Sequence, residues 1–298
     1  MNATTKVKGH LFALFCVIVW GITFIVSTML LEVFTPIQTM LLRFVVAYFV
    51  LWALHPKWYF RWQDEVAFLL MSLFSNTLYF VAENTALTYT QSSNVSILVS
   101  TAPVLTAILL ALTPNGEKPT RNTVLGILVA FVGMALVVFN GSVVLKLNPI
   151  GDLLSFGAAL SWAIYGVILQ RYSSRFSSYL ISRKLMFYGI LTSLPLLLAE
   201  GAPFQLSALF TSPKLLLGLL FLAVLGSALC YVCWNSAADT LGVLQTTMYI
   251  YAIPFVTMVA AAFYLDETIT LMGIAGAILI VLGMLFSSQT PKSQESTP

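Results

Sequence analysis

Ten long apolar runs follow one another along the chain, and they constrain its fold more than any other feature. A helix needs about 20 apolar residues to cross the hydrocarbon of a bilayer. The runs cover residues 11–31, 37–54, 66–86, 95–112, 123–140, 153–169, 179–199, 215–234, 244–265 and 269–287. They are apolar on every face, without the period of two that a barrel strand requires. The sequence therefore predicts an all-α integral membrane protein with ten transmembrane helices.

Composition excludes a water-soluble fold. Only 8% of the 298 residues are charged, whereas a soluble domain carries about 25%. The net charge of +3 is small and scattered, which does not favour nucleic-acid binding. The first run follows a short basic segment, as in a signal peptide, but it is too long for one and further spans follow. We expect this run to be retained as the first span, with the lipid bilayer as a partner and no nucleic acid.

Basic residues in the loops predict the orientation. With the N-terminus inside, nine Lys and Arg residues fall in the inner segments, whereas only Lys146 and Lys214 fall in the outer loops. Cytoplasmic loops of membrane proteins carry such an excess. We expect a multi-pass protein of the cell (inner) membrane with both termini cytoplasmic, and residues 288–298 as a disordered cytoplasmic tail.

The two halves of the chain match each other at a nearly constant offset of 142 to 151 residues. The matches that composition does not explain are Trp20 with Trp162, Asn84 with Asn235, Pro103 with Pro254, Glu117 with Glu267, Gly126 with Gly276, and Gly133 with Gly283. Each half holds five spans, so the second half enters the membrane from the opposite side. The sequence predicts two inverted five-helix repeats, residues 10–140 and 150–287, an architecture that exposes a central site alternately to each face.

Several motifs together resemble the EamA family of the drug/metabolite transporter superfamily. They are the Trp in the first helix of each repeat, the segment ENTALTYTQSSNVSILVSTAPVLTAILLAL over the third and fourth runs, and a Glu before a Gly-x6-Gly-Met helix. The resemblance covers about residues 10–287. It implies a secondary transporter that moves a small metabolite, amino acid or drug-like solute by alternating access, as an exporter, without naming the cargo. It implies no cofactor.

Charged residues inside the spans are candidates for the transport site, because a charge at the centre of a membrane helix costs about 2.5–3.5 kcal/mol. Arg43 and Glu83 lie within the second and third runs, each near the outer face. They form either a structural ion pair, or a site in which Glu83 takes up a proton and Arg43 grips an anionic group. Arg183 and Lys184 lie one turn into the seventh run. Either Lys184 is the counterpart of Arg43 in the second repeat, so that each half has a cation near an opposite entrance, or both side chains extend to the inner lipid headgroups.

Two prolines interrupt the fourth and ninth runs. Pro103 and Pro254 each lack an N–H and free the carbonyl four residues back. Ser100, Thr101 and Tyr251 lie beside these breaks, and aromatic and amide side chains elsewhere supply flat walls and hydrogen bonds for a small solute. The predicted substrate-binding residues are Trp20, Arg43, Tyr79, Glu83, Asn84, Ser100, Thr101, Trp162, Tyr165, Trp234, Asn235 and Tyr251, with Pro103 and Pro254 as helix-breaking residues.

Other functions find less support in the sequence. The chain has no phosphate-binding loop and no stretch long enough for a nucleotide domain. Its two histidines lie at interfaces far apart, and no nucleophile–base pair or metal-ligand set is evident, so we predict neither an enzyme nor a metal site. A passive channel or a membrane scaffold without coupled transport stays open as an alternative. The glycines of the fifth and tenth runs suit close helix packing, within the chain or in a homodimer.

Overall fold

The computed structural model describes residues 3–90, 92–114, 116–139, 148–265 and 269–288, and the regular structure in these ranges is helical throughout. Nine of the described helical segments are long and apolar enough to cross a membrane, and a tenth apolar helix over residues 271–287 is shorter. The prediction of ten spans in an all-α membrane protein is confirmed.

Six spans are single helices. They are α1 (Ala3–Leu31), α2 (Pro36–Leu54), α7 (Arg121–Phe139), α8 (Pro149–Tyr172), α9 (Ser178–Glu200) and α15 (Leu271–Ser288). Local signals set several of their starts. Thr35 and Gln38 form a capping box at the start of α2, and the side chain of Asn148 accepts from the first amides of α8. These caps satisfy amides that have no partner within the helix.

Four spans are interrupted near the middle, and they occupy corresponding places in the two halves. The third span joins α3 (Trp62–Ser72) to α4 (Leu78–Tyr89), and the eighth joins α11 (Pro213–Leu220) to α12 (Cys230–Leu241). The joints are π-helical segments, η1 (Leu73–Thr77) and η2 (Phe221–Leu229). The fourth span breaks between α5 (Ser92–Val99) and α6 (Ala102–Leu112). The ninth contains the 3₁₀ segment η3 (Met248–Ala252) between α13 (Val243–Thr247) and α14 (Ile253–Leu265).

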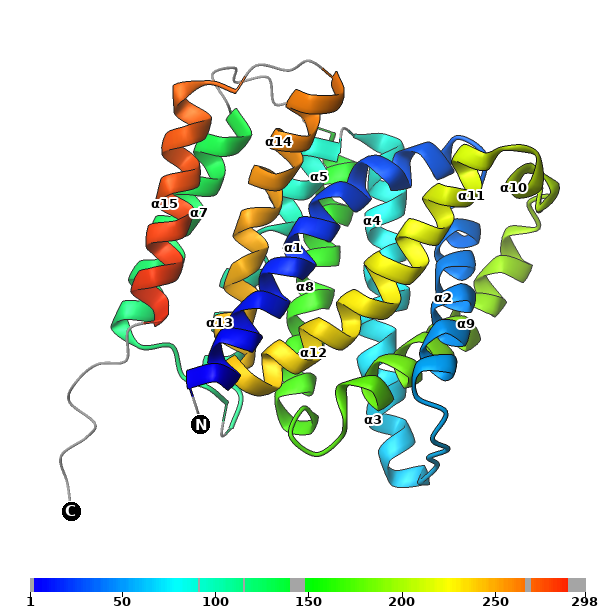
Figure 1. The fold of residues 1–298 in the computed structure, drawn as a ribbon, viewed down its shortest axis with the longest axis horizontal. Coiled ribbons are helices and arrows are strands. Elements are labelled where there is room, and N and C mark those ends of the chain that lie inside the picture. The colour runs from blue at the N-terminus through cyan, green and yellow to red at the C-terminus, as the bar shows by residue number, and fades with distance from the viewer. Residues whose placement is uncertain (1–2, 91, 115, 140–147, 266–268, 289–298) are drawn as a thin grey trace.

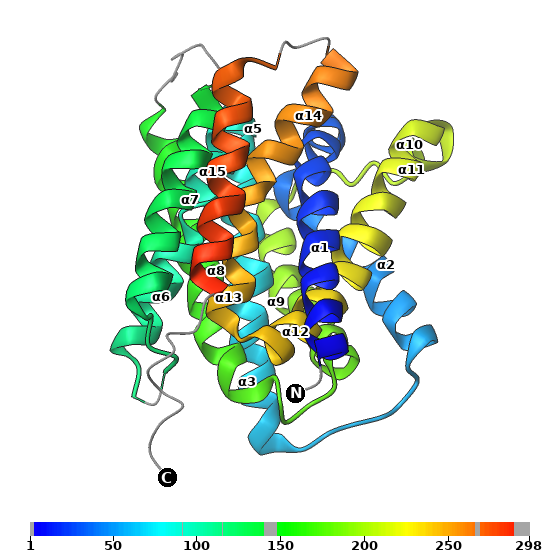
Figure 2. The same cartoon turned by 60° about the vertical axis from the view of Figure 1, so that its left-hand side comes forward.

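Helices of the two halves interleave in the bundle. Figure 1 shows α1 beside α12 and α14, and α2 beside α9, with α4 against α8 behind them. The last helix of each half, α7 and α15, form a pair at one side of the molecule, with α14 next to them (Figures 1 and 2). The start of α1 and the end of α15 lie at the same end of the bundle, together with the start of α3 (Figure 1).

Glycine makes the α7–α15 contact possible. A Cβ on Gly126 would lie 2.4 Å from the carbonyl oxygen of Gly283, and one on Gly133 would lie 2.6 Å from that of Gly276. The glycines of the fifth and tenth runs therefore pack against each other within the chain.

Several helices extend beyond the apolar runs. α1 begins at Ala3 rather than at residue 11, and the eighth span runs to Leu241 rather than to 234. The reason is that hydrogen bonding carries a helix past the hydrocarbon boundary into the headgroups and water. A short extra helix, α10 (Ser207–Thr211), lies in the connection before the eighth span. The predictions for Lys146, Glu267 and the tail beyond residue 288 fall outside the described residues.

Candidate substrate-binding site

A small cavity lies between the halves, around residues near the middle of their helices. It is lined by Trp20, Thr23, Phe24, Arg43, Tyr79, Phe80, Glu83, Val99, Trp162, Tyr231, Ile250 and Ile253. The cavity measures about 30 Å³, which is room for about two water molecules. This conformation is therefore closed to a metabolite, because ligand pockets usually measure about 300–1,000 Å³.

Aromatic rings make up much of the cavity wall. Trp162 stands edge-on to Trp20, with ring centroids 5.4 Å apart, and its ring also packs on Tyr79 at 5.3 Å and on Tyr231 at 6.0 Å. The ring of Trp234 packs on Trp20, with ring centroids 4.9 Å apart. We call these five rings, of Trp20, Tyr79, Trp162, Tyr231 and Trp234, the aromatic box. Edge-to-face and tilted contacts at these distances are favourable. The two repeat-related tryptophans thus meet at the centre of the molecule.

The π-helical segments provide acceptors for this aromatic box. Trp20 donates its indole N–H to the carbonyl of Gly226 in η2 at 2.9 Å, and Tyr231 donates its hydroxyl to the carbonyl of Ser75 in η1 at 2.8 Å. Each bond joins one half of the chain to the other. π segments occur often at functional sites, and here they hold the rings of the cavity in place.

Arg43 is buried at the cavity, with 1% of its surface exposed. Its Nε donates to the hydroxyl of Ser227 at 3.2 Å, and its guanidinium carbon lies 4.4 Å from the ring centroid of Phe80. Among the described residues the ion pairs within 4.0 Å are Arg175–Asp64 and Lys184–Glu65. The guanidinium of Arg43 therefore has neutral partners but no carboxylate at ion-pair distance.

Glu83 is also buried and lines the same cavity. Its carboxylate accepts the hydroxyl of Tyr79, one helical turn earlier, at 3.0 Å. The structural ion pair between Glu83 and Arg43 does not form within 4.0 Å. The cavity thus holds a cationic and an acidic group whose charges do not pair directly.

Both helix breaks reach the cavity. Val99 and Ile250, four residues before Pro103 and Pro254, line it from the fourth and ninth spans, and the carbonyl of Ile250 accepts the amide of Ile253. Pro103 lies in the first turn of α6, and Pro254 in the first turn of α14. The interruptions lie where irregular backbone is tolerated in a membrane, beside an internal cavity.

The two asparagines of the predicted site do not line the cavity. Asn84 donates to the carbonyl of Pro36 at 3.3 Å, at the start of α2. Asn235 accepts the hydroxyl of Tyr165 and donates to Ser182 at 3.0 Å. In this conformation these amides and Tyr165 bond to neighbouring helices and do not line the cavity.

The remaining predicted residues lie around the breaks but outside the cavity lining. Ser100 and Thr101 donate to the carbonyls of Ser96 and Leu98 in the preceding turn, at 2.7 and 2.6 Å. Thr101 borders a separate apolar groove between α6 and α7. Tyr251 is fully buried, and its hydroxyl has no hydrogen-bond partner in the described structure.

Sequence reasoning missed several lining residues, among them Thr23, Phe24 and Phe80. Helical periodicity around the predicted positions contains the signal for these three. Thr23 and Phe24 follow Trp20 by three and four residues, the spacing that shares a helix face, and Phe80 precedes Glu83 by three. No group of three or more His, Cys, Asp or Glu side chains suitable for a metal occurs among the described residues.

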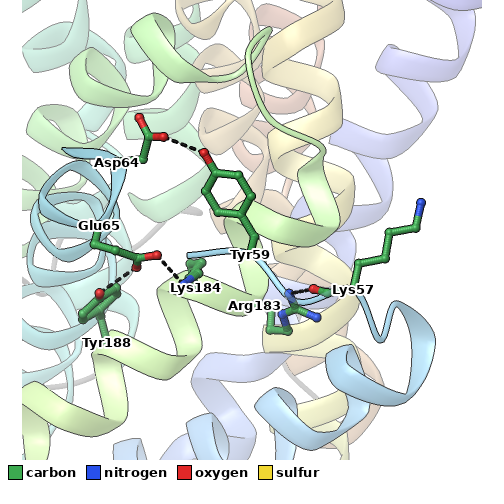
Figure 3. A network of polar contacts seen from close by, with 7 residues as sticks. All are labelled: Lys57, Tyr59, Asp64, Glu65, Arg183, Lys184 and Tyr188. Atoms are coloured by element: carbon green, nitrogen blue, oxygen red, sulfur yellow. Dashed lines mark hydrogen bonds and ion pairs between the residues drawn. The ribbon is translucent and has the colours of Figure 1, made fainter. Parts of the chain in front are cut away.

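A second polar cluster lies at the end of the bundle that holds the start of α3. Figure 3 shows Lys184 and Tyr188 of α9 converging on Glu65, at 2.5 and 2.7 Å. Asp64 accepts the hydroxyl of Tyr59 at 2.5 Å and pairs with Arg175 at 2.9 Å. Lys184 therefore forms an ion pair with Glu65 at this end of the bundle.

Comparison with known proteins decides the family. The EamA-like transporter family matches residues 7–139 and again residues 149–289. The chain belongs to this family. EamA membership, together with the apolar helices, establishes a multi-pass membrane protein with a transport role, whose partners are a small-molecule solute and membrane lipid.

Similar proteins occur in several bacteria and in an archaeon. The uncharacterized transporter YyaM of Bacillus subtilis is 30% identical over 234 residues, 76% of this chain and 74% of that protein. A probable amino-acid metabolite efflux pump of Salmonella typhimurium is 25% identical over 288 residues, 93% of each chain. A crystal structure aligns with a TM-score of 0.76 over 96% of this chain and 97% of the other, at 17% identity, which shows the shared fold alone.

Proposed function

We propose that this EamA protein is a secondary transporter that exports a small zwitterionic metabolite of the amino-acid type across the cytoplasmic membrane by alternating access. The observation that carries the proposal is the central cavity, in which buried Arg43 and Glu83 lie without a direct ion pair among aromatic rings. Similar proteins of Salmonella typhimurium and Escherichia coli bear the name probable amino-acid metabolite efflux pump, which supports this class of solute.

The two charges suit the two ends of a zwitterion. A guanidinium binds a carboxylate through parallel hydrogen bonds, so Arg43 takes the carboxylate of the solute. Glu83 takes its ammonium group, and the rings of Trp20 and Trp162 cover the apolar part. Since the cavity holds only about two waters, the described conformation is the closed one, and the halves must move apart to admit the solute.

Glu83 also serves as the proton carrier in this proposal. A proton that moves down a membrane potential releases about 2.3 kcal/mol per 100 mV. Proton entry as the solute leaves would drive export, with Glu83 binding the ammonium group and the proton in turn.

The proposed orientation places both termini in the cytoplasm. Most Lys and Arg residues lie in the segments that are on the same side of the membrane as the N-terminus, as in cytoplasmic loops. The start of α1 and the end of α15 also lie at one end of the bundle (Figure 1), which supports placing both termini on that side. Residues 10–140 and 150–287 are then the two inverted repeats that rock against each other.

Flux into proteoliposomes tests the proposal. Purified protein is reconstituted, and uptake of a panel of labelled amino acids is measured with and without an imposed proton gradient. We expect saturable flux that unlabelled substrate inhibits. Arg43→Gln should weaken the apparent affinity for the amino acid by about ten- to a hundredfold, because that is the loss expected when a hydrogen bond to a charged group is removed. Arg171→Gln, an exposed position at the end of α8, is the matched control and should behave as the wild type.

Three outcomes count against the proposal. Flux that never saturates indicates a passive channel. Equal flux in Arg43→Gln and wild type removes Arg43 from the site. Glu83→Gln with an unchanged dependence on external pH removes Glu83 as the proton carrier.

A further inference from the structure

A second pocket lies away from the central cavity, at the end of the bundle that carries the Glu65 cluster. The last two turns of α2, the first turns of α9 and the loop over residues 55–61 enclose it, and about 230 Å³ is accessible to the centre of a water-sized sphere. Its walls are mainly aromatic, with Trp52 from α2, Trp58 and Phe60 from the loop, and Phe187 from α9. Arg183 and Lys184 supply its cationic edge.

Arg183 lies over the ring of Trp52, with its guanidinium carbon 5.6 Å from the ring centroid, but it has no anionic partner among the described residues. Its guanidinium donates to the carbonyls of His55, at 2.6 Å, and of Lys57 (Figure 3). Both acceptors are neutral, and among the described residues no carboxylate lies within 4.0 Å of Arg183. Only 5% of its surface is exposed. Lys184 differs, because Glu65 pairs with it at 2.5 Å. A buried cation without an anion is costly, so the pocket suits an anionic ligand.

The depth of the pocket matches the headgroup region. Arg183 lies five residues into α9, about 7.5 Å from the helix start at 1.5 Å per residue. Trp58 and Trp62 are 81% and 73% exposed in and beside the loop, as expected for an aromatic belt at a membrane surface. Lys57 and Arg61 of the same loop add positive charge. The cationic edge therefore lies near the boundary between headgroups and hydrocarbon.

We propose that this pocket binds the headgroup of an anionic phospholipid, with Arg183 against the phosphate and the rings of Trp52 and Trp58 around the glycerol. About 230 Å³ accommodates a headgroup but not the acyl chains, which would lie along the apolar side chains exposed to lipid, such as Phe49, 66% exposed on α2. Basic pockets between membrane helices bind anionic headgroups in this way. Since α2 and α9 belong to different halves, the lipid also ties the halves together at this end.

Lipid binding to the full-length protein in detergent tests the proposal. The thermal unfolding temperature is followed while phosphatidylglycerol, phosphatidylcholine with the same acyl chains, or free glycerol phosphate is added, and native mass spectrometry counts retained lipid. We expect a saturable rise with phosphatidylglycerol and one retained lipid, but not with the other two. Arg183→Gln should weaken phosphatidylglycerol binding about ten- to a hundredfold, whereas Arg171→Gln, exposed at the same end, should bind as the wild type does.

A second variant guards against misfolding of Arg183→Gln. Trp58→Ala alters an exposed loop residue of the pocket and should weaken phosphatidylglycerol binding by about threefold or more while the protein stays folded. Equal responses to phosphatidylglycerol and phosphatidylcholine overturn the proposal, as does an equal loss in Arg183→Gln and Arg171→Gln, or wild-type binding in Trp58→Ala. A response to glycerol phosphate as strong as that to phosphatidylglycerol assigns the pocket to free phosphate and overturns the lipid assignment.

Discussion

Alanine at the glycines between α7 and α15 should destabilise the protein, and the structure sets the size of the effect. A Cβ on Gly133 would lie 2.6 Å from the carbonyl oxygen of Gly276 and 2.7 Å from the amide nitrogen of Ile280. Both atoms belong to the backbone and cannot rotate away. Because an ordinary contact of a Cβ begins at 3.4 Å, Gly133→Ala has to push α7 and α15 apart by about 0.8 Å in this close-packed interface.

Two opposing contributions determine the net change in the free energy of unfolding. A gap of 0.5–1 Å forfeits about a quarter to a half of the dispersion energy of the affected contacts, and overpacking of this kind typically costs about 1–3 kcal/mol. Alanine gains about 0.5–1 kcal/mol over glycine as a helix former. The net expectation for Gly133→Ala is a loss of roughly 1–2 kcal/mol.

Gly157→Ala in α8 is the matched control. A Cβ at Gly157 meets nothing within 4 Å, so only the helix-propensity gain of about 0.5–1 kcal/mol remains. Thermal unfolding of both variants in the same detergent should shift the unfolding temperature in opposite directions. If Gly133→Ala proved as stable as Gly157→Ala, the close approach of α7 and α15 would be refuted.

Two further substitutions test contacts between the halves. Trp20→Phe keeps an aromatic ring but leaves the Gly226 carbonyl without its 2.9 Å donor, and we expect it to lower the free energy of unfolding by about 1–3 kcal/mol. Thermal unfolding measures this loss, with Trp58→Phe at an exposed position as the control. Equal stability of the two variants would contradict the role of this bond. Burial raises the pKa of the Glu117 carboxyl, in the loop before α7, although the amide of Leu244 donates to it at 3.3 Å. Because the pKa of this carboxyl is higher in the folded than in the unfolded state, its contribution to the free energy of unfolding is fully present below about pH 4.3. That contribution is lost as the pH rises through the raised pKa. Glu117→Gln should remove this part of the pH dependence of the unfolding temperature, and an unaltered pH profile contradicts it.

The ten spans and two of their interruptions could be predicted from sequence, because hydropathy and proline act locally. Pro103 and Pro254 each remove a helix hydrogen bond and lie in the first turns of α6 and α14, although Pro195 lies within the unbroken helix α9. The π segments η1 and η2 have no such local signal. Leu73–Thr77 and Phe221–Leu229 hold no proline, and their free carbonyls accept donors from distant helices, as Gly226 does from Trp20.

The site could be predicted only in part. Tryptophans at matching places in the repeats, and charges inside apolar runs, identified Trp20, Trp162, Arg43 and Glu83, which do line the cavity. The same repeat argument also selected Asn235, which instead bonds to other helices. The same residue at matching places of the two repeats does not by itself indicate a binding role. A side-chain amide within a membrane needs hydrogen-bond partners whether or not it faces a solute. Apolar lining residues such as Ile253 carry no chemical signal at all.

The distribution of charge links the two proposed sites. Arg43 on α2 and Arg183 on α9 occupy the second helix of the first and second halves, and these helices pack side by side. Both guanidinium groups are buried on neutral oxygens, with no carboxylate within 4.0 Å among the described residues. The acids Asp64 and Glu65 lie at the same end of the bundle as Arg183, but they pair with Arg175 and Lys184.

A charge at the centre of a membrane helix costs about 2.5–3.5 kcal/mol, and at Arg43 no ion pair within 4.0 Å among the described residues offsets that cost. Arg43 lies in the central cavity and Arg183 lies at one end of the bundle, so each guanidinium occupies a different depth of the α2–α9 pair. Both proposals therefore use the same chemistry, a buried guanidinium that binds an anionic ligand. In the two proposals, the anion at Arg43 is the carboxylate of a transported solute, and the anion at Arg183 is the phosphate of a bound lipid.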